Sequence, residues 1–189
     1  LAYFSKDFTQ PIERTLKISS GSGELVTYKN AQSAVSSGVE IDFRYDLDFL
    51  KTGAFALGLS GNYSIIESDV VLAEGHTEYS DTRPMQGQSP YTMNAMVTVD
   101  HDNWGLETAF ILNEIGERIT RVGQGSVPHV YEQPFTALDF TLSQELADGK
   151  LSFKLKNLLT NERLFTQGNK VYQKTDPSMS FSLSYGQSF

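Results

Sequence analysis

Apolar and polar residues alternate along most of this chain with a period of two. The stretch VEIDFRYDL, from Val39, sets Val39, Ile41 and Phe43 against charged neighbours. Successive side chains of a strand point to opposite faces, so this period indicates β-strands. The same alternation predicts strands at 3–9, 39–47, 55–65, 91–99, 104–112, 138–146, 151–157 and 181–189. The sequence therefore predicts an all-β chain of about eight strands, several of them longer than the usual five or six residues.

Short and long connections alternate strictly between these strands. The short ones lie at 48–53, 101–103 and 147–150, and the long ones at 10–31, 68–88, 120–134 and 158–177. Asp148-Gly149 favours a hairpin, because glycine accepts the positive φ of a two-residue primed turn. In an antiparallel up-and-down meander, this order puts every short turn at one end and every long loop at the other.

Alternation alone does not say whether the apolar face covers a soluble core or meets lipid. Three features favour a transmembrane β-barrel: strands of about 9–11 residues, lopsided loops, and a second face rich in Gly, Ser, Thr and Asn. A soluble β-barrel or sandwich is the alternative. The predicted lipid-facing residues are Ile41, Phe43, Leu57, Leu59, Val97, Leu106, Phe140, Leu142, Phe153 and Leu155.

The last strand carries large apolar side chains at alternate positions, and Gln187 interrupts the row. The row consists of Phe181, Leu183, Tyr185 and the terminal Phe189. This ending resembles the strand by which bacterial outer-membrane proteins are recognised during assembly, where strand addition uses a free edge and alternate side chains. We expect the outer-membrane assembly machinery to read it. The alternative is that Phe189 is only an aromatic anchor at the membrane interface.

Five segments, in order, resemble the C-terminal third or so of a TonB-dependent receptor, a part of its β-barrel. They are KDFTQPIE (6–13), YKNAQSAVSSGVEIDF (28–43), GNYSIIESDV (61–70), RPMQGQSPYTMNAMV (83–97) and KLKNLLTNERLF (154–165). Leu159, Thr160 and Phe165 stand where the family more often has Phe, Asp and Tyr. The resemblance implies that residues 1–189 form a C-terminal segment of a transmembrane barrel in the outer membrane of a Gram-negative bacterium. It also implies outer-membrane lipid as a partner, and TonB coupling through a plug and earlier strands absent from this chain.

Composition excludes several other classes of protein. The chain has 15 Lys and Arg against 23 Asp and Glu, a net charge of −8, which argues against nucleic-acid binding. It has no cysteine, so thiolate chemistry is excluded. His76, His101 and His129 lack metal-ligand spacing and read as solvated loop or turn histidines. No nucleophile–base pattern is present, so we expect no enzyme, metal or cofactor.

Two functions follow from the sequence. The first is outer-membrane ligand uptake by a TonB-dependent active transporter, with a siderophore-bound iron, cobalamin or a glycan as ligand. The second is a self-contained eight-stranded outer-membrane barrel with an adhesion or structural role. For uptake, the loop 68–88 is the predicted ligand loop, because His76, Tyr79 and Arg83 form a mixed polar and aromatic set. The alternative is a variable loop with no ligand role. Glu40, Asp42 and Arg44 are expected to line the lumen.

Overall fold

The computed structural model describes residues 1–19, 23–47 and 54–187. The predicted turn at 48–53 and the terminal Phe189 lie outside the described residues. The strands are β1 (Ala2–Thr9), β2 (Ile12–Ser19), β3 (Gly23–Asn30), β4 (Ser33–Asp46), β5 (Phe55–Val71), β6 (Tyr91–His101), β7 (Leu106–Ile115), β8 (Arg118–Gly123), β9 (Val130–Glu132), β10 (Phe135–Leu146), β11 (Gly149–Lys156), β12 (Arg163–Gln167), β13 (Lys170–Thr175) and β14 (Ser180–Gly186). In this part of the chain, no helix is long and apolar enough to cross a membrane.

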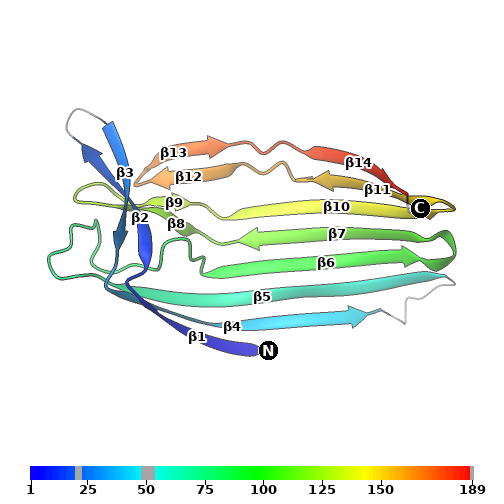
Figure 1. The fold of residues 1–189 in the computed structure, drawn as a ribbon, viewed down its shortest axis with the longest axis horizontal. Helices are drawn as coiled ribbons and strands as arrows, with labels where there is room; N and C mark the ends of the chain where they lie inside the picture. The colour runs from blue at the N-terminus through cyan, green and yellow to red at the C-terminus, as the bar shows by residue number, and fades with distance from the viewer. Residues whose placement is uncertain (20–22, 48–53, 188–189) are drawn as a thin grey trace.

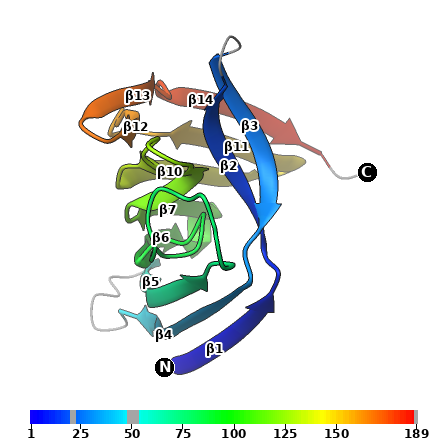
Figure 2. The same cartoon turned by 90° about the vertical axis from the view of Figure 1, so that its left-hand side faces the viewer.

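Eight strands form one long antiparallel sheet in the order β1-β4-β5-β6-β7-β10-β11-β14 (Figure 1). This is the predicted up-and-down meander. The strands form an arc with an open side (Figure 2), and β1 and β14 are the two edges. A self-contained eight-stranded barrel needs β1 paired with β14, and the structure does not contain that pairing.

The register of this sheet gathers the predicted lipid-facing residues on one face. Val97 lies opposite Leu59 and Phe110, and Phe140 lies opposite Phe110 and Leu155. Residues directly opposite in an antiparallel pair share a face of the sheet. The same register holds for all ten predicted residues, so their common parity is confirmed. We call this side of the eight-stranded sheet the outward face.

The opposite, inner face of the sheet is polar and small. Ser60, Asn62 and Ser64 of β5 lie on it, paired with Met96, Asn94 and Thr92 of β6. The Asn94 side-chain amide donates a 2.8 Å hydrogen bond to the Asn62 Oδ1. Side chains of this kind suit contact with water or with another polar surface rather than with lipid.

The short turns at 101–103 and 147–150 lie together at one end of the sheet, as predicted (Figure 1). The β6–β7 turn is a 3-10 turn, Asp102–Trp104, and Gly105 follows it with φ 57°. Strand β7 therefore begins at Leu106, two residues later than predicted.

In the β10–β11 hairpin, Leu146 pairs with Gly149, so the two turn residues are Ala147 and Asp148. Gly149 does not have a positive φ, which corrects the predicted role of this glycine. A side chain at Gly149 would collide with the Gly186 carbonyl and the Tyr185 ring, so close approach of β14 excludes larger residues.

All four long connections were predicted as loops. Three of them, 10–31, 120–134 and 158–177, contain strands instead. They form a second sheet in the order β13-β12-β9-β8-β2-β3, which we call the loop sheet (Figure 1). Its strands are antiparallel except for a short parallel contact between β2 and β8. The most deeply buried apolar side chains of the described chain lie here: Leu16, Ile119, Val122 and Val130. The large buried apolar side chains therefore gather in the loop sheet. A smaller buried cluster of Ala31, Ala34 and Val70, with Phe8 packed against it, lies at the β1–β4–β5 part of the long sheet.

Candidate functional site

The predicted ligand loop 68–88 packs against the loop sheet. The Tyr79 N–H donates to the Gly123 carbonyl at 3.0 Å, and the Gly125 N–H donates to the Thr77 carbonyl at 2.7 Å. An isolated bridge between Glu78 and Gln124 lies between these bonds. The loop is therefore held by backbone contacts in one conformation against β8.

Arg83 anchors this loop to β2 through a cluster of buried charged side chains. Its guanidinium donates to both oxygens of Glu13 on β2, at 2.8 and 2.5 Å. Its Nε donates to Glu78 at 2.7 Å. The Arg83 side chain is 1% exposed and the Glu13 side chain 5%. Planar guanidinium groups match carboxylates in this two-bond arrangement, which fixes orientation as well as charge.

Burial lowers the pKa of Arg83, but hydrogen bonds and charge attraction from Glu13 and Glu78 outweigh it and leave the pKa raised. Arg83 therefore stays cationic. Two carboxylates against one guanidinium leave the cluster with excess negative charge, and backbone donors offset part of it. The Gln86 N–H, for example, lies 3.3 Å from Glu13 Oε1.

Gln86 adds a second connection between the loop and the loop sheet. Its side-chain amide donates to the carbonyls of Arg14 and Thr120, at 2.7 and 2.8 Å, and its Oε1 accepts from the Arg14 N–H at 2.6 Å. One side chain thus satisfies backbone groups of both β2 and β8. These are the strands that meet in the short parallel contact.

His129 joins the loop to the β8–β9 connection. Its Nδ1 accepts a 2.9 Å hydrogen bond from the Gly123 N–H, so its proton sits on Nε2, which lies 2.8 Å from Ser80 Oγ. Gly123 has no space for a side chain, because the carbonyls of Val127 and Pro128 occupy it. Burial, and then the nearby Arg83 charge, lower the pKa of His129, while Glu78 and Glu13 partly oppose them. The sequence predicted solvated histidines here and at His101, and both predictions are wrong: His129 is 3% exposed and His101 is 8% exposed.

The three predicted ligand residues occupy different environments. Tyr79 is 50% exposed, and its ring packs edge-on against His129 with centroids 5.5 Å apart. His76 is half-buried, and its Nε2 lies 3.5 Å from the exposed Asp81 carboxylate. Arg83 is buried, with its donors directed at Glu13 and Glu78. Tyr79 and His76 are therefore accessible at the loop surface, whereas Arg83 lies beneath it.

A second buried ion cluster holds the other half of the loop sheet. Glu132 of β9 is 2% exposed and lies 2.7 Å from Arg118 of β8 and 2.9 Å from Arg163 of β12. Sequence reasoning singled out neither this cluster nor Glu13 and Glu78. The isolated charges in strand-like segments gave no local sign that their partners lie on other strands.

Side chains also connect the two edge strands of the loop sheet. Tyr172 of β13 donates a 2.6 Å hydrogen bond to Glu24 of β3. Arg121 of β8 donates to the same tyrosine oxygen and lies 5.0 Å from the centre of its ring. Burial, and then the bond to Glu24, raise the pKa of Tyr172, so its hydroxyl remains a donor. The loop sheet therefore curls back on itself beyond the long strands (Figure 2).

The terminal strand β14 shows the predicted alternation. Phe181, Leu183 and Tyr185 lie opposite Leu155, Phe153 and Leu151 of β11, on the outward face. They are 77%, 66% and 53% exposed. Because β14 is an edge, its second row of backbone groups has no partner strand among the described residues.

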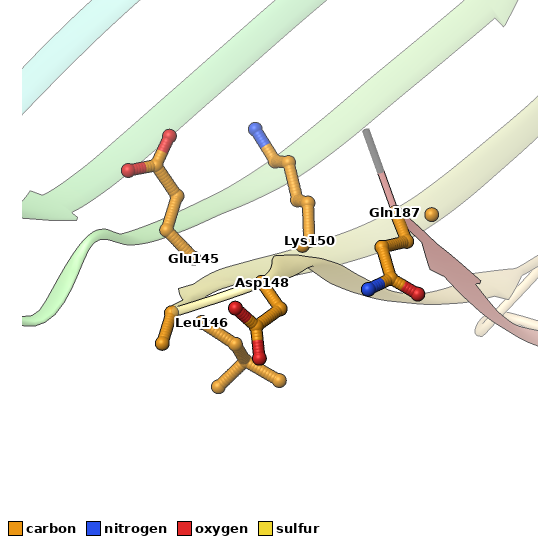
Figure 3. A pocket seen from close by; sticks show the side chains of 8 residues that line it. Glu145, Leu146, Asp148, Lys150 and Gln187 are labelled. Carbon is orange, nitrogen blue, oxygen red and sulfur yellow. The ribbon is translucent and has the colours of Figure 1, made fainter. Parts of the chain in front are cut away.

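A hollow of about 610 Å³ lies beside the β10–β11 turn and the end of the described chain. Figure 3 shows Glu145 and Lys150 on one side of this hairpin and Leu146 and Asp148 on the other. Lys150 Nζ lies 2.7 Å from the carboxylate of Glu107, so the ammonium group that lines this hollow is already paired. Across the described ranges, no group of three or more Asp, Glu or His side chains is placed to hold a metal ion.

Comparison with known proteins gives a match to a protein family. A family model described as "TonB dependent receptor-like, beta-barrel" matches residues 1–158. No curated protein and no solved structure matches the chain. The matched range covers β1 to β11 and therefore includes the loop 68–88 and the Arg83 cluster.

Proposed function

The chain belongs to the TonB-dependent receptor β-barrel family of the outer membrane, and from this premise we propose that it forms ligand-binding and barrel-wall parts of an active uptake receptor. The family consists of transporters and not of enzymes. The proposed ligand is a siderophore-bound iron, cobalamin or a glycan. The proposed ligand contacts are Tyr79 and His76, on the loop that Arg83 anchors.

One observation carries this proposal: the loop 68–88 is preorganised. Arg83, Gln86 and His129 fix it to three different strands or connections of the loop sheet. Binding to a loop that is already ordered avoids part of the entropic cost of ordering it. An exposed tyrosine on such a loop offers a large rigid surface with a polar tip, which suits contact with a small molecule or a sugar.

We further propose three partners for the protein. The outward face contacts outer-membrane lipid, and the outer-membrane assembly machinery reads β14 through Phe181, Leu183, Tyr185 and Phe189. TonB coupling takes place through parts of the receptor outside these 189 residues. Glu40, Asp42 and Arg44 have inner-face parity on β4, and we propose that they line the lumen.

Uptake assays test this proposal. A strain lacking the receptor is complemented with wild type, with a deletion of residues 72–80, or with Tyr79→Ala, and is supplied with iron chelates, cobalamin or glycans. The proposal expects the deletion and Tyr79→Ala to lower uptake of one ligand at normal surface level. Leu159→Ala, at an exposed residue outside the loop, is the control. Unchanged uptake with the deletion would remove this loop from the binding site.

A further inference from the structure

A second cavity opens where β5 extends past its neighbour. β5 pairs with β6 only as far as Ile65, opposite Tyr91, and continues to Val71. The segment 84–90 fills part of the gap: the Pro90 carbonyl accepts from the Ile66 N–H at 2.9 Å, and Ser68 Oγ accepts from the Met85 N–H at 3.0 Å. A cleft of about 400 Å³ remains between the end of β5 and strands β8 and β9.

The walls of this cleft combine apolar and aromatic surface. Pro84, Pro90 and Ile66 contribute apolar surface, and the ring of Tyr131 lies on the β9 side. The volume falls within the range of small-molecule sites, which are mostly apolar with a few polar groups that fix orientation. Burial, and then the Glu117 charge, raise the pKa of Tyr131, so the ring is a neutral phenol at physiological pH.

The charged groups of the cleft give it a negative sign. Glu67, Asp69 and Glu117 contribute three carboxylates against the single guanidinium of Arg118. The Arg118 charge is already directed at Glu132, at 2.7 Å. Within the described residues, none of the three carboxylates is part of an ion pair, and Glu117 accepts only one 2.8 Å bond from Gln133.

The two β5 carboxylates lie on the outward side of the sheet. Glu67 and Asp69 pair with Ser37 and Val35 of β4, and they share the parity of Tyr63 and Ile65. Tyr63 stacks with Tyr91 at 6.2 Å between ring centres, and both residues lie on this face. The carboxylates therefore lie at the end of the apolar outward face and not on the polar inner face that carries Glu40 and Asp42.

We propose that this cleft binds a small organic cation with an apolar body, such as an alkylated ammonium. The cation would lie against the face of Tyr131, where the ring quadrupole attracts positive charge, with Glu67, Asp69 and Glu117 around it. Pro84, Pro90 and Ile66 contact the apolar body. The site is separate from the loop surface around Tyr79, so the inference does not rest on the proposed uptake function.

Equilibrium binding to the purified receptor in a non-ionic detergent tests the inference. The probes are benzyltrimethylammonium, neutral benzyl alcohol and anionic 4-tert-butylbenzoate, measured by saturation-transfer NMR titration. We expect saturable binding of the cation alone. The double change Glu67→Gln/Asp69→Asn should weaken it at least about tenfold, and both residues are exposed, so folding should survive. Tyr131→Leu should weaken it as well.

The matched control is Glu40→Gln/Asp42→Asn, which removes the same charge from the inner face of neighbouring β4. It should leave the dissociation constant unchanged. Equal weakening by this control would show that the cation responds to overall charge, and equal binding of the anion would show hydrophobic binding only. Either result, or no saturable binding by wild type, would overturn the inference. Because the assay measures no uptake, its outcome is independent of the transport proposal.

Discussion

Both carboxylate oxygens of Glu13 receive hydrogen bonds from the guanidinium of Arg83, although 70 residues separate the two in sequence. The pair joins β2 of the loop sheet to the loop that follows β5. A carboxylate on one long connection thus fixes the conformation of the next. The loop sheet and the predicted ligand loop should therefore open together rather than separately.

Arg83→Ala should destabilise this layer strongly. Removing one partner of a buried ion pair leaves the other charge unpaired, which costs about 3–5 kcal/mol. Hydrogen exchange on the purified receptor should show lost protection in both the 68–88 loop and β2. Lys150→Ala breaks the exposed pair with Glu107 and should cost no more than about 1 kcal/mol. Equal effects of the two changes would contradict a structural role for Arg83.

His129 should make the same layer sensitive to acid. Its pKa is lowered in the folded protein by burial and by Arg83, whereas the unfolded chain has the ordinary value of about 6.5. The stability that comes from keeping His129 neutral is therefore fully present above about pH 6.5. It is lost progressively as the pH falls from there toward the lowered pKa of the folded state.

Protection factors, corrected for the intrinsic exchange rate, measure this effect between pH 7 and pH 5. Amides of 76–80 and 123–130 should lose protection as the pH falls through this window. His129→Gln keeps an acceptor for Gly123 and a donor for Ser80 but does not titrate, so its profile should be flatter. The same acid response in both proteins would assign the effect to other groups.

The eight long strands were predictable because apolar and polar residues alternate along each of them. Val39, Ile41 and Phe43 are apolar and share one face of the sheet, and this parity can be read without knowing the partner strands. The loop sheet follows a different rule. In β2, the neighbours Thr15 and Leu16 are both buried, together with the charged Glu13, so no alternation appears. Arg83, whose positive charge stabilises the buried carboxylate of Glu13, lies 70 residues away in the sequence. No local pattern around Glu13 indicates this partner.

The candidate site was predictable only in part, for the same reason. A loop that carries His76, Tyr79 and Arg83 could be identified from composition, but the division between exposed Tyr79 and buried Arg83 depends on Glu13. The Ala147–Asp148 turn shows the same limit on a small scale. Gly149 indicated a hairpin correctly, but the reason for this glycine is the nearby β14 backbone and not the turn.

Orientation of the long sheet is tested by a pair of arginine substitutions. Leu142 lies on the outward face opposite Phe153, and its neighbour Thr141 lies on the inner face opposite Lys154. In the intact receptor, Leu142→Arg should lower the free energy of unfolding by about 2–4 kcal/mol if it lies near the midplane. Thr141→Arg should be much milder. Denaturant unfolding in lipid measures both, and a larger loss for Thr141→Arg would reverse the assignment of the faces.

The last hairpin offers a test of close packing between β11 and β14. Gly149→Ala places a methyl group against the Gly186 carbonyl and the Tyr185 ring, and overpacking of this kind costs about 1–3 kcal/mol. Gly186→Ala meets no atom within 4 Å and serves as the control. The heat-induced gel shift of the folded receptor should begin at a lower temperature for Gly149→Ala alone. Equal shifts would indicate that lost glycine flexibility, and not the contact, determines the result.

The terminal strand should matter more for assembly than for the stability of the finished barrel. Phe181, Leu183 and Tyr185 remain more than half exposed in β14, so each side chain contributes less than a buried one. Phe189, which lies outside the described residues, continues the row by two positions beyond Gln187. Its loss should remove at most the roughly 1.5–3 kcal/mol of one large apolar side chain. Recognition of the strand before the barrel closes has only this one row of side chains to use.

Phe189→Ala should therefore lower the surface level of the receptor in cells and leave protease-sensitive protein in the periplasm, while the same variant refolded in detergent melts close to wild type. Phe140→Ala removes an identical side chain from the outward face of β10, where Phe110 packs against it at 4.9 Å between ring centres. This control should show the opposite pattern, with lower thermal stability in detergent and normal delivery to the surface. If Phe189→Ala were instead well assembled but easily melted, the residue would be an anchor at the membrane interface, and recognition would depend on Phe181, Leu183 and Tyr185 alone.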